Sequence, residues 1–391
     1  MNGPVSNVDY RLDRPAFWHY NALSEARDAA PVVGNTNCGG FSMVQRYDDV
    51  RSVLQDPHTF TNETISPFNP VQTLRLLPQV LNPPEQIWYR RVLNPWFSPA
   101  SVNRRLPVVR AHCATLVASM VEQGSCDFVA DFALRFPTDI FLHMLGLPID
   151  DGALFLPWME TIFAGFFGGD TRAMAAAVGS IIAYFDARVA EREASPGDPE
   201  TDFISYLLRS RIGDEPLARA DLVTMCMTLS LAGLDTTRAQ MGYIWHHHAT
   251  RPADRELLVA SPDLLPSAIE EFLRLYTLVL TAGRRVAADT TVAGCPMANR
   301  DVVWLGLLSA NRDPAHFHDP DAFVADRTPN PHVAFGAGAH RCLGADLARA
   351  EIAVAFKEWH RLIPDYRLAN DEPLTERGGQ LTLATLPLVW P

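Results

Sequence analysis

The chain has 391 residues, of which 48% are apolar and 20% charged, a balance typical of a globular protein with a large core. Lys and Arg number 33 against 45 Asp and Glu, and this net charge of −12 argues against a nucleic-acid partner, because phosphate groups need a basic surface. The polar first residues and the short length of the most apolar run, 222–234, predict neither a secretory signal nor a membrane anchor.

The six cysteines are dispersed along the chain and form no C-x-x-C pair. Their spacing signals neither a zinc site nor a disulfide framework, and unpaired cysteines are typical of a reducing compartment. We therefore expect a cytoplasmic protein with five cysteines in inert positions, and Cys342 as the exception.

Periodicity predicts a mainly α protein with small β sheets. Alternating apolar residues and turn signals predict strands in three segments: 31–60, 276–310 and 366–391. Apolar residues at three- and four-residue spacing predict two helical stretches: 83–275 and 342–363. The segment 311–334 is rich in Asp, Pro and His and is expected to be irregular. No linker interrupts the chain, so we expect one domain over residues 1–391.

The stretch "FGAGAHRCLG", residues 335–344, places one cysteine inside a glycine-rich loop directly before a helix. Glycine permits tight turns and close backbone approach, and a helix N-terminus favours a thiolate. Three chemistries could use Cys342 here: a nucleophile, a structural metal ligand, or a thiolate bound to a cofactor. His340 is too close along the chain to be a good base for a nucleophilic cysteine. A buried structural cysteine is the remaining alternative.

Two further patterns carry polar groups into apolar helices. In "LSLAGLDTTRAQ", residues 229–240, Asp235 and Thr236 interrupt an apolar run that resumes at Met241. Threonine inside a helix can bond to the carbonyl one turn back and bend the helix, although a helix simply leaving the core would look similar. In "EEFLRL", Glu271 and Arg274 lie three apart on one helix face, a spacing that is also common on protein surfaces.

Together these motifs resemble the cytochrome P450 monooxygenases. The loop matches the family pattern F-x-x-G-x-x-x-C-x-G at four positions: Phe335, Gly338, Cys342 and Gly344. The resemblance covers essentially the whole chain and implies the α-rich prism fold of that family. It also implies haem b as the cofactor, with Cys342 as the axial thiolate of the iron, and a soluble bacterial-type monooxygenase reaction.

The resemblance assigns roles to the other motifs. It implies that "AGLDTT" is the oxygen-binding groove, with Ala232 and Gly233 beside the haem and Asp235 and Thr236 as the catalytic acid–alcohol pair that delivers protons. The pair Glu271 and Arg274 would form a structural clamp with Arg327, in the coil before the cysteine loop.

The resemblance also implies residues that hold the haem carboxylates: Gln86, Arg90, Arg284 and His340. Glutamine at position 86, where the family more often has histidine, is similar to the camphor-hydroxylase branch. Arg285 competes with Arg284 for this role, and solvated surface charge is the plain alternative.

The family's substrate pocket implies an apolar lining drawn from variable segments: Phe68, Phe163, Phe166, Phe167, Leu229, Val279 and Leu381. Core packing would explain these residues equally well. An apolar pocket fits a hydrophobic small molecule, and terpenoid, fatty-acyl, steroid and aromatic substrates all remain open.

No flavin or iron–sulfur motif is present, so electrons are expected from a ferredoxin and its reductase. Their docking face is expected to be basic: Arg91, Arg104, Arg105 and Arg341. We expect a monomer. Two rival functions are a peroxygenase driven by peroxide and a haem-based sensor or electron carrier without catalysis. The intact Asp235-Thr236 pair disfavours the first, and the sensor would need neither that pair nor a substrate pocket.

Overall fold

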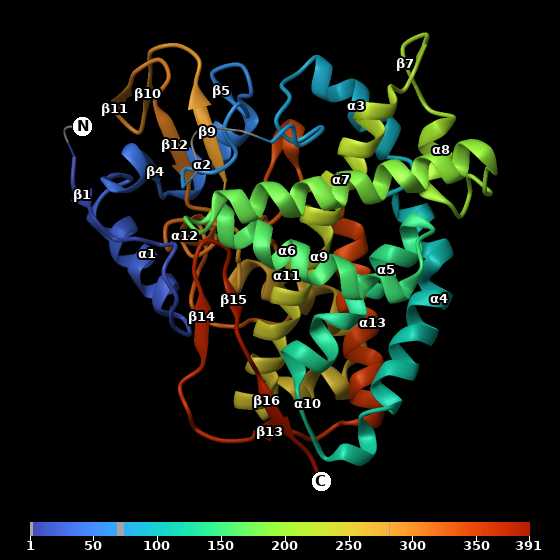
Figure 1. Cartoon of the computed structure of the whole chain (residues 1–391). Helices are drawn as coiled ribbons and strands as arrows, with labels where there is room; N and C mark the ends of the chain where they lie inside the picture. Colours follow the sequence, from blue (N-terminus) through green and yellow to red (C-terminus); the bar gives the residue numbers. More distant parts are fainter. Residues whose placement is uncertain (1–2, 69–73, 281) are drawn as a thin grey trace.

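Helices form most of the structure, a computed structural model that describes residues 3–68, 74–280 and 282–391 (Figure 1). The longer helices are α1 Trp18–Ala29, α2 Tyr47–Gln55, α3 Glu85–Leu93, α4 Pro99–Ala118, α5 Arg135–Leu145, α6 Gly152–Phe166, α7 Thr171–Ala194, α9 Arg219–Thr250, α10 Pro252–Ala260, α11 Leu265–Leu275 and α13 Ala345–Leu362. Two short helices complete the set, α8 Phe203–Leu208 and α12 Leu307–Ala310, and a π-helical turn at Phe128–Ala133 precedes α5. The mainly α fold expected from periodicity is confirmed.

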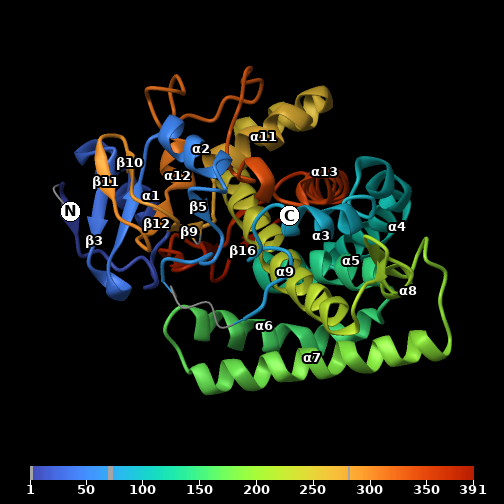
Figure 2. The same ribbon diagram turned by 90° about the horizontal axis from the view of Figure 1, so that it is seen from above.

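The helix α9 is the central element of this body. Most of its residues are buried, and it packs against α5, α7 and α13. Seen from above, α9 runs diagonally through the middle of the molecule, with α6 and α7 along one edge (Figure 2). A helix surrounded in this way is held rigidly, so side chains on it are well suited to line a site.

The largest sheet has six strands in the order β1-β3-β4-β12-β9-β5, and lies beside the helical body (Figure 1). Apart from β1, its strands begin in two of the segments predicted to contain strands, 31–60 and 276–310, which the sheet brings together. Its strands are β1 Val5–Ser6, β3 Val32–Asn35, β4 Phe41–Val44, β5 Phe60–Thr61, β9 Gly283–Val286 and β12 Val302–Leu305. Strand β12 pairs in parallel with β4 and antiparallel with β9.

Four smaller sheets contain the remaining strands. The C-terminal strands β13 Arg367–Leu368 and β16 Pro387–Val389 pair with β6 Ser125–Asp127, and β14 Thr375–Arg377 lies between β15 Thr382–Leu383 and β2 Arg14–Pro15. Two hairpins are formed by β7 Arg211–Ile212 with β8 Glu215–Pro216, and by β10 Thr290–Val292 with β11 Cys295–Met297. The segment 311–334 is irregular, as expected.

One helix in the described part of the chain, α7, is long and apolar enough to cross a membrane, with a mean hydropathy of 1.3. Its apolar side chains Met174, Ile181, Phe185 and Val189 are buried, and it packs on α6 and α9. Its length and apolar composition therefore have an explanation within the fold, as the outer layer of the helical body.

Candidate active site

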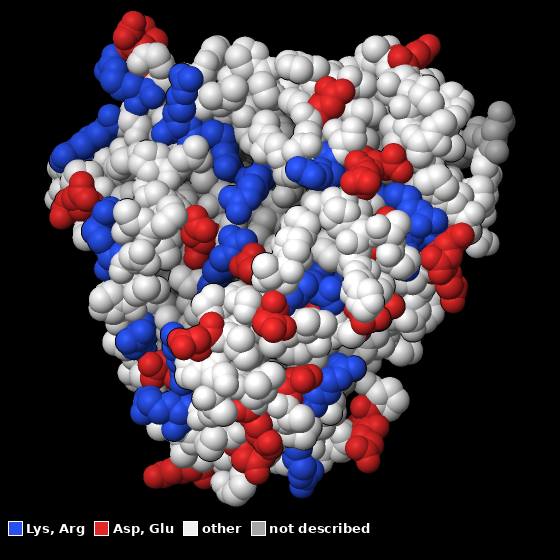
Figure 3. Space-filling model, turned by 180° about the vertical axis from the view of Figure 1, so that it is seen from behind, with Lys and Arg blue, Asp and Glu red and all other residues white. Residues whose placement is uncertain are grey.

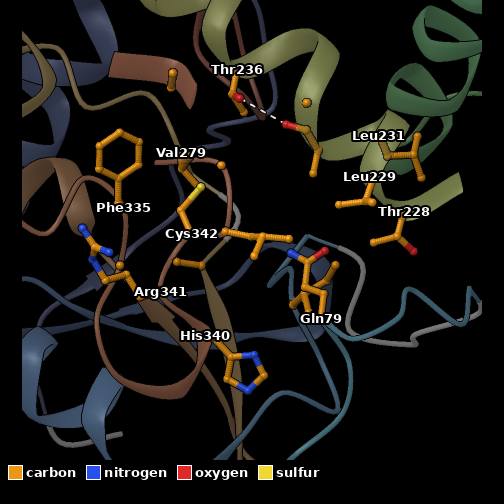
Figure 4. A pocket seen from close by; sticks show the side chains of 18 of the residues that line it. Gln79, Thr228, Leu229, Leu231, Thr236, Val279, Phe335, His340, Arg341 and Cys342 are labelled. Atoms are coloured by element: carbon orange, nitrogen blue, oxygen red, sulfur yellow. Dashed lines mark hydrogen bonds between the residues drawn. The ribbon is translucent and has the colours of Figure 1, made fainter. Parts of the chain in front are cut away.

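A cavity of about 410 Å³ lies between the loop that contains Cys342 and the middle of α9. In Figure 4 the Cys342 sulfur points toward the helix that carries Thr236, with Leu229 and Leu231 along the same wall. Most of the lining is apolar, and it is drawn from segments spread along the whole chain. Among the described cysteines, Cys342 alone borders this cavity.

Backbone hydrogen bonds fix the cysteine loop. The N–H of Cys342 donates to the carbonyl of Phe335 at 2.8 Å, and the N–H of Gly336 donates to Val333 at 2.8 Å. Gly338 has φ +68°, and a Cβ there would lie 2.6 Å from the carbonyl oxygen of Leu54, at the end of α2. Glycine at 338 is therefore required by close packing on α2 as well as by the turn itself.

The last helix begins later than the sequence predicted. Periodicity placed its start at Cys342, whereas α13 begins at Ala345, with Gly344 as its N-cap. The cysteine thus lies just ahead of the helix. The backbone N–H of Gly344 still donates to the Cys342 sulfur and favours its thiolate form.

Two opposing effects act on the Cys342 thiol. Burial raises its pKa, and the Gly344 N–H together with the charges of Arg90, Arg341 and Arg349 lowers it, with a net rise. The Cys342 side chain is accessible to solvent only because it borders the cavity, and protein surrounds it on its other sides. The described residues contain no cluster of three His, Cys, Asp or Glu side chains able to hold a metal ion, so the structure builds no multi-residue metal site around this sulfur.

Three cationic or polar side chains at the cavity lack an anionic partner among the described residues. Arg284 is almost fully enclosed, its guanidinium donates to the carbonyl of Gly283, and burial lowers its pKa to about 10. Burial also lowers the pKa of Arg90, which lines the same cavity. His340 Nε2 is buried without a partner, and burial together with the charges of Arg284 and Arg90 lowers the pKa of that ring to about 3. A dianionic ligand such as haem, with two carboxylates, would satisfy all three.

Arg284 and Arg285 point to opposite faces of β9, because successive strand residues alternate. Arg284 borders the cavity, whereas Arg285 donates to the carbonyl of Arg300 on the outer side. The alternation of side chains along β9 therefore places Arg284, and not Arg285, at the cavity. Gln86 also lines the cavity, but its amide Nε2 donates to the carbonyl of Ala339 at 2.8 Å and so braces the cysteine loop.

The wall formed by α9 brings Ala232, Gly233 and Thr236 to the cavity. The Thr236 hydroxyl donates to the carbonyl of Ala232 at 3.1 Å, one turn back (Figure 4). Asp235 does not border the cavity. Its carboxylate pairs with Arg238, one turn further along α9, and accepts a hydrogen bond from Gln380 at 3.1 Å.

The structure brings the three residues of the expected clamp together. Arg274 donates to both carboxylate oxygens of Glu271 at 2.7 Å, and Arg327 donates to the same two oxygens at 3.0 Å. Arg274 also donates to the carbonyls of Asn311, Pro320 and Ala322. This network ties α11 to the irregular segment that leads into the cysteine loop.

Five of the seven expected pocket residues border the cavity: Phe163, Phe166, Phe167, Leu229 and Val279. Phe68 does not, because its ring packs against Phe41 and Trp304 in the core. Leu381 does not border the cavity either, since it is fully buried while its neighbour Gln380 lines the cavity.

Two functional candidates had no signal in the sequence. Gln380 follows a pair of glycines, in a segment where the sequence predicted the apolar Leu381 as the pocket residue. Glu351 lies on α13, borders the cavity and is 2% exposed, and burial raises its pKa well above the usual value. Its hydrogen bond with Thr237 of α9 could not be foreseen, because the two residues meet only through helix packing.

Comparison with known proteins shows which family shares this fold. The family model described as cytochrome P450 matches residues 259–373. The steroid C26-monooxygenase of Mycolicibacterium smegmatis is 30% identical over 100% of this chain and 98% of its own length. The mycinamicin IV hydroxylase/epoxidase of Micromonospora griseorubida is 32% identical, covering 89% of each chain. The crystal structure of CYP101J2 superposes with a TM-score of 0.91 at 27% identity over 100% of this chain and 98% of that one.

A cysteine loop that faces the central helix α9 across a mostly apolar cavity is the arrangement of a haem–thiolate protein. The chain belongs to the cytochrome P450 family, and is a monooxygenase within the oxidoreductases. The family and fold imply a haem whose iron takes a cysteine thiolate as axial ligand. Cys342 is the cysteine that borders the cavity, and Arg284, Arg90 and His340, which have no anionic partner among the described residues, fit the haem carboxylates.

Proposed function

We propose that this monooxygenase inserts one oxygen atom from dioxygen into a hydrophobic small molecule of the terpenoid, fatty-acyl, steroid or aromatic kind. The observation that carries the proposal is the apolar wall opposite Cys342, in which Phe163, Phe166 and Leu229 leave few polar anchors. A relative named as a steroid C26-monooxygenase supports a hydrophobic ligand.

Each residue at the cavity has a role toward the cofactor. When bound, the haem supplies the redox chemistry that reduces and cleaves dioxygen. Cys342 would ligate it from the α13 side, and Arg90, Arg284 and His340 would hold its carboxylates in place of the anionic partners they lack. Gln86 would act indirectly, because its amide already supports the loop at Ala339.

Thr236 and Asp235 would deliver the protons that the reaction consumes. The Thr236 hydroxyl borders the cavity, where its oxygen can hold a water molecule or pass a proton inward. Its bond to Ala232 is local, so the hydroxyl hydrogen can turn into the cavity without unfolding the helix. Asp235 sits on the far side of that turn and would carry protons from the protein exterior once it releases Arg238. The apolar lining would keep other water out.

Electrons would come from a ferredoxin and its reductase, in the bacterial cytoplasm. Arg91 and Arg104 are exposed, whereas Arg341 borders the cavity beside Cys342. The two exposed arginines would meet an acidic partner. Arg105 differs, since its guanidinium stacks over Trp96 and donates to Ser101. The chain has a net charge of −12, so a local basic surface is needed to attract an acidic partner. Figure 3 shows a run of Lys and Arg that leads from the edge of one face toward a hollow.

A spectral screen tests the proposal. The purified protein should contain haem b, and its reduced carbon-monoxide complex should show the red-shifted Soret band of thiolate ligation. Cys342→His should lose this band, whereas the matched control Cys295→Ser should keep it. Hydrophobic compounds that shift the ferric spectrum should then be oxidised with ferredoxin, its reductase and dioxygen. Turnover with peroxide alone would favour a peroxygenase, and binding without oxygen consumption would favour a sensor.

A further inference from the structure

The carboxylate of Asp235 is held at both of its oxygens. Arg238, on the next turn of α9, pairs with Oδ1, and the amide Nε2 of Gln380 donates to Oδ2 at 3.1 Å. Both members of the ion pair are largely shielded, with 12% of the Asp235 side chain and 15% of the Arg238 side chain exposed. A shielded carboxylate restrained from two sides moves only when one of these bonds opens.

Gln380 reaches Asp235 from a different part of the chain. It lies in the C-terminal segment between β14 and β15, where Gly379 adopts φ +76°. Two main-chain links fix this segment beside the cavity: Gln380 forms an isolated bridge with Val279, and the Leu381 N–H donates to Leu278 at 3.1 Å. A Cβ at position 379 would lie 2.4 Å from the ring of Phe167, so the glycine also allows the cavity wall to close there.

Gln380 therefore touches both parts of the machinery. It borders the cavity, unlike Asp235 and Arg238, and it alone among the cavity-lining residues described here bonds to Asp235. Its backbone cannot shift without disturbing Val279 and Leu278, which line the same wall. A ligand that fills this part of the cavity would therefore contact the side chain that restrains the carboxylate.

We propose that Gln380 is a positioning residue that links occupancy of the substrate cavity to the orientation of Asp235. The Gln380 amide holds Oδ2 while Arg238 holds Oδ1, and displacement of the amide by a bound ligand leaves the carboxylate on a single contact from which it can turn. This inference rests on the proton-delivery role proposed for Asp235.

The variant Gln380→Met tests the link, because methionine keeps the length of the side chain and removes the donor. The experiment uses the holoenzyme with a bacterial ferredoxin and its reductase, both with testosterone as a probe and without any probe, since uncoupled turnover also consumes protons. A lost hydrogen bond predicts that reductant consumption changes by about 2- to 10-fold and that the solvent isotope effect on it changes as well. In the Asp235→Asn background, Gln380→Met should have no further effect.

Two direct measurements accompany the kinetics. Crystal structures of the holoenzyme should show Asp235 within hydrogen-bond distance of residue 380 in the wild type and reoriented in Gln380→Met. The control Gln123→Met makes the same substitution at an exposed glutamine away from the cavity, whose amide donates to the carbonyl of Ser119 at 3.0 Å, so it should leave both the ligand affinity, read from the ferric spin-state shift, and the isotope effect as they are. Thermal unfolding verifies that each variant is folded.

The outcomes separate this inference from the proposed function. If Asp235→Asn turns over like the wild type, the proton-delivery role of Asp235 fails. If Asp235→Asn is slow while Gln380→Met matches the wild type, or if Gln380→Met has the same effect in both backgrounds, only the link through Gln380 is overturned. An unchanged Asp235 orientation in the Gln380→Met crystal would also overturn it.

Discussion

Arg327 donates from Nε to both carboxylate oxygens of Glu271, at 3.0 Å each, although 56 residues separate the two in the chain. Glu271 is fully buried and also holds Arg274, so one carboxylate neutralises two guanidinium groups. We expect Glu271→Ala to destabilise the protein by about 3–5 kcal/mol, because it leaves two cations without a buried partner. Denaturant unfolding and haem content of the purified protein measure the effect.

The control for this prediction is an exposed ion pair. Arg300 and Glu63 pair at 2.8 Å with 66% and 48% of their side chains exposed. Glu63→Ala should change stability by less than about 1 kcal/mol, as is usual for surface pairs. Equal losses in the two variants would mean that the Glu271 network is not a special clamp.

Thr236→Ala should separate electron consumption from product formation. Without the Thr236 hydroxyl, the protons that dioxygen consumes are no longer delivered by a positioned group. We therefore expect the yield of hydrogen peroxide to rise and the product formed per reductant to fall by about tenfold or more. Thr224→Ala is a matched control, because Thr224 lies on the same helix, donates to the carbonyl one turn back at 2.7 Å and faces solvent. If both variants keep wild-type coupling, Thr236 has only a structural role.

Buried neutral histidines should make the protein less stable in acid. His248 is fully buried, neither ring nitrogen has a partner, and burial together with nearby positive charge lowers its pKa well below 6.5. The unfolded chain binds a proton below about pH 6.5 and the folded chain does not, so stability is complete above that pH and is lost as the pH falls.

His248→Leu should flatten this dependence by up to about 1.4 kcal/mol per pH unit below pH 6.5, measured by unfolding between pH 7 and pH 5. His318→Asn serves as the control, because 91% of that side chain is exposed. A slope unchanged in His248→Leu would contradict the prediction.

Glu351 should act in the opposite direction. Burial raises its pKa well above 4.5, so above about pH 4.5 the unfolded chain releases a proton that the folded chain keeps. Its contribution to stability is therefore complete below pH 4.5 and declines as the pH rises toward the pKa of the folded state. Glu351→Gln remains neutral at every pH, and its stability relative to the wild type should increase from pH 5 to pH 8. A constant difference across that range would show that Glu351 is ionised in the folded protein.

Charge reversal on the basic face should slow the first electron transfer. We expect Arg91→Glu and Arg104→Glu to reduce the rate of reduction by ferredoxin about tenfold at low salt, and added salt to slow the wild type, because screening weakens steering. Stopped-flow reduction gives the rate. Arg172→Glu, an exposed site on α7, makes the same change in net charge and should leave the rate near that of the wild type. A rate indifferent to salt and to all three variants would place docking elsewhere.

Much of this protein was determined by its sequence alone. The spacing around Cys342, the Asp235-Thr236 interruption and the Glu271–Arg274 pair are local patterns, in which a fixed number of residues sets a fixed geometry on a turn or helix. Periodicity predicted the helical body and the strand segments for the same reason. These patterns were sufficient for the family, the cofactor and the class of reaction.

The tertiary structure decided what depends on long-range packing. The alternation of side chains along β9 places Arg284, rather than Arg285, at the cavity. The turn at Gly379 places Gln380 there in place of Leu381. Helix packing set Glu351 against Thr237, and core packing removed Phe68 from the cavity. Each outcome turns on which of two neighbouring side chains faces inward, or on which distant elements meet. A local pattern does not contain that information, because the energy that decides it comes from contacts between segments far apart in the chain.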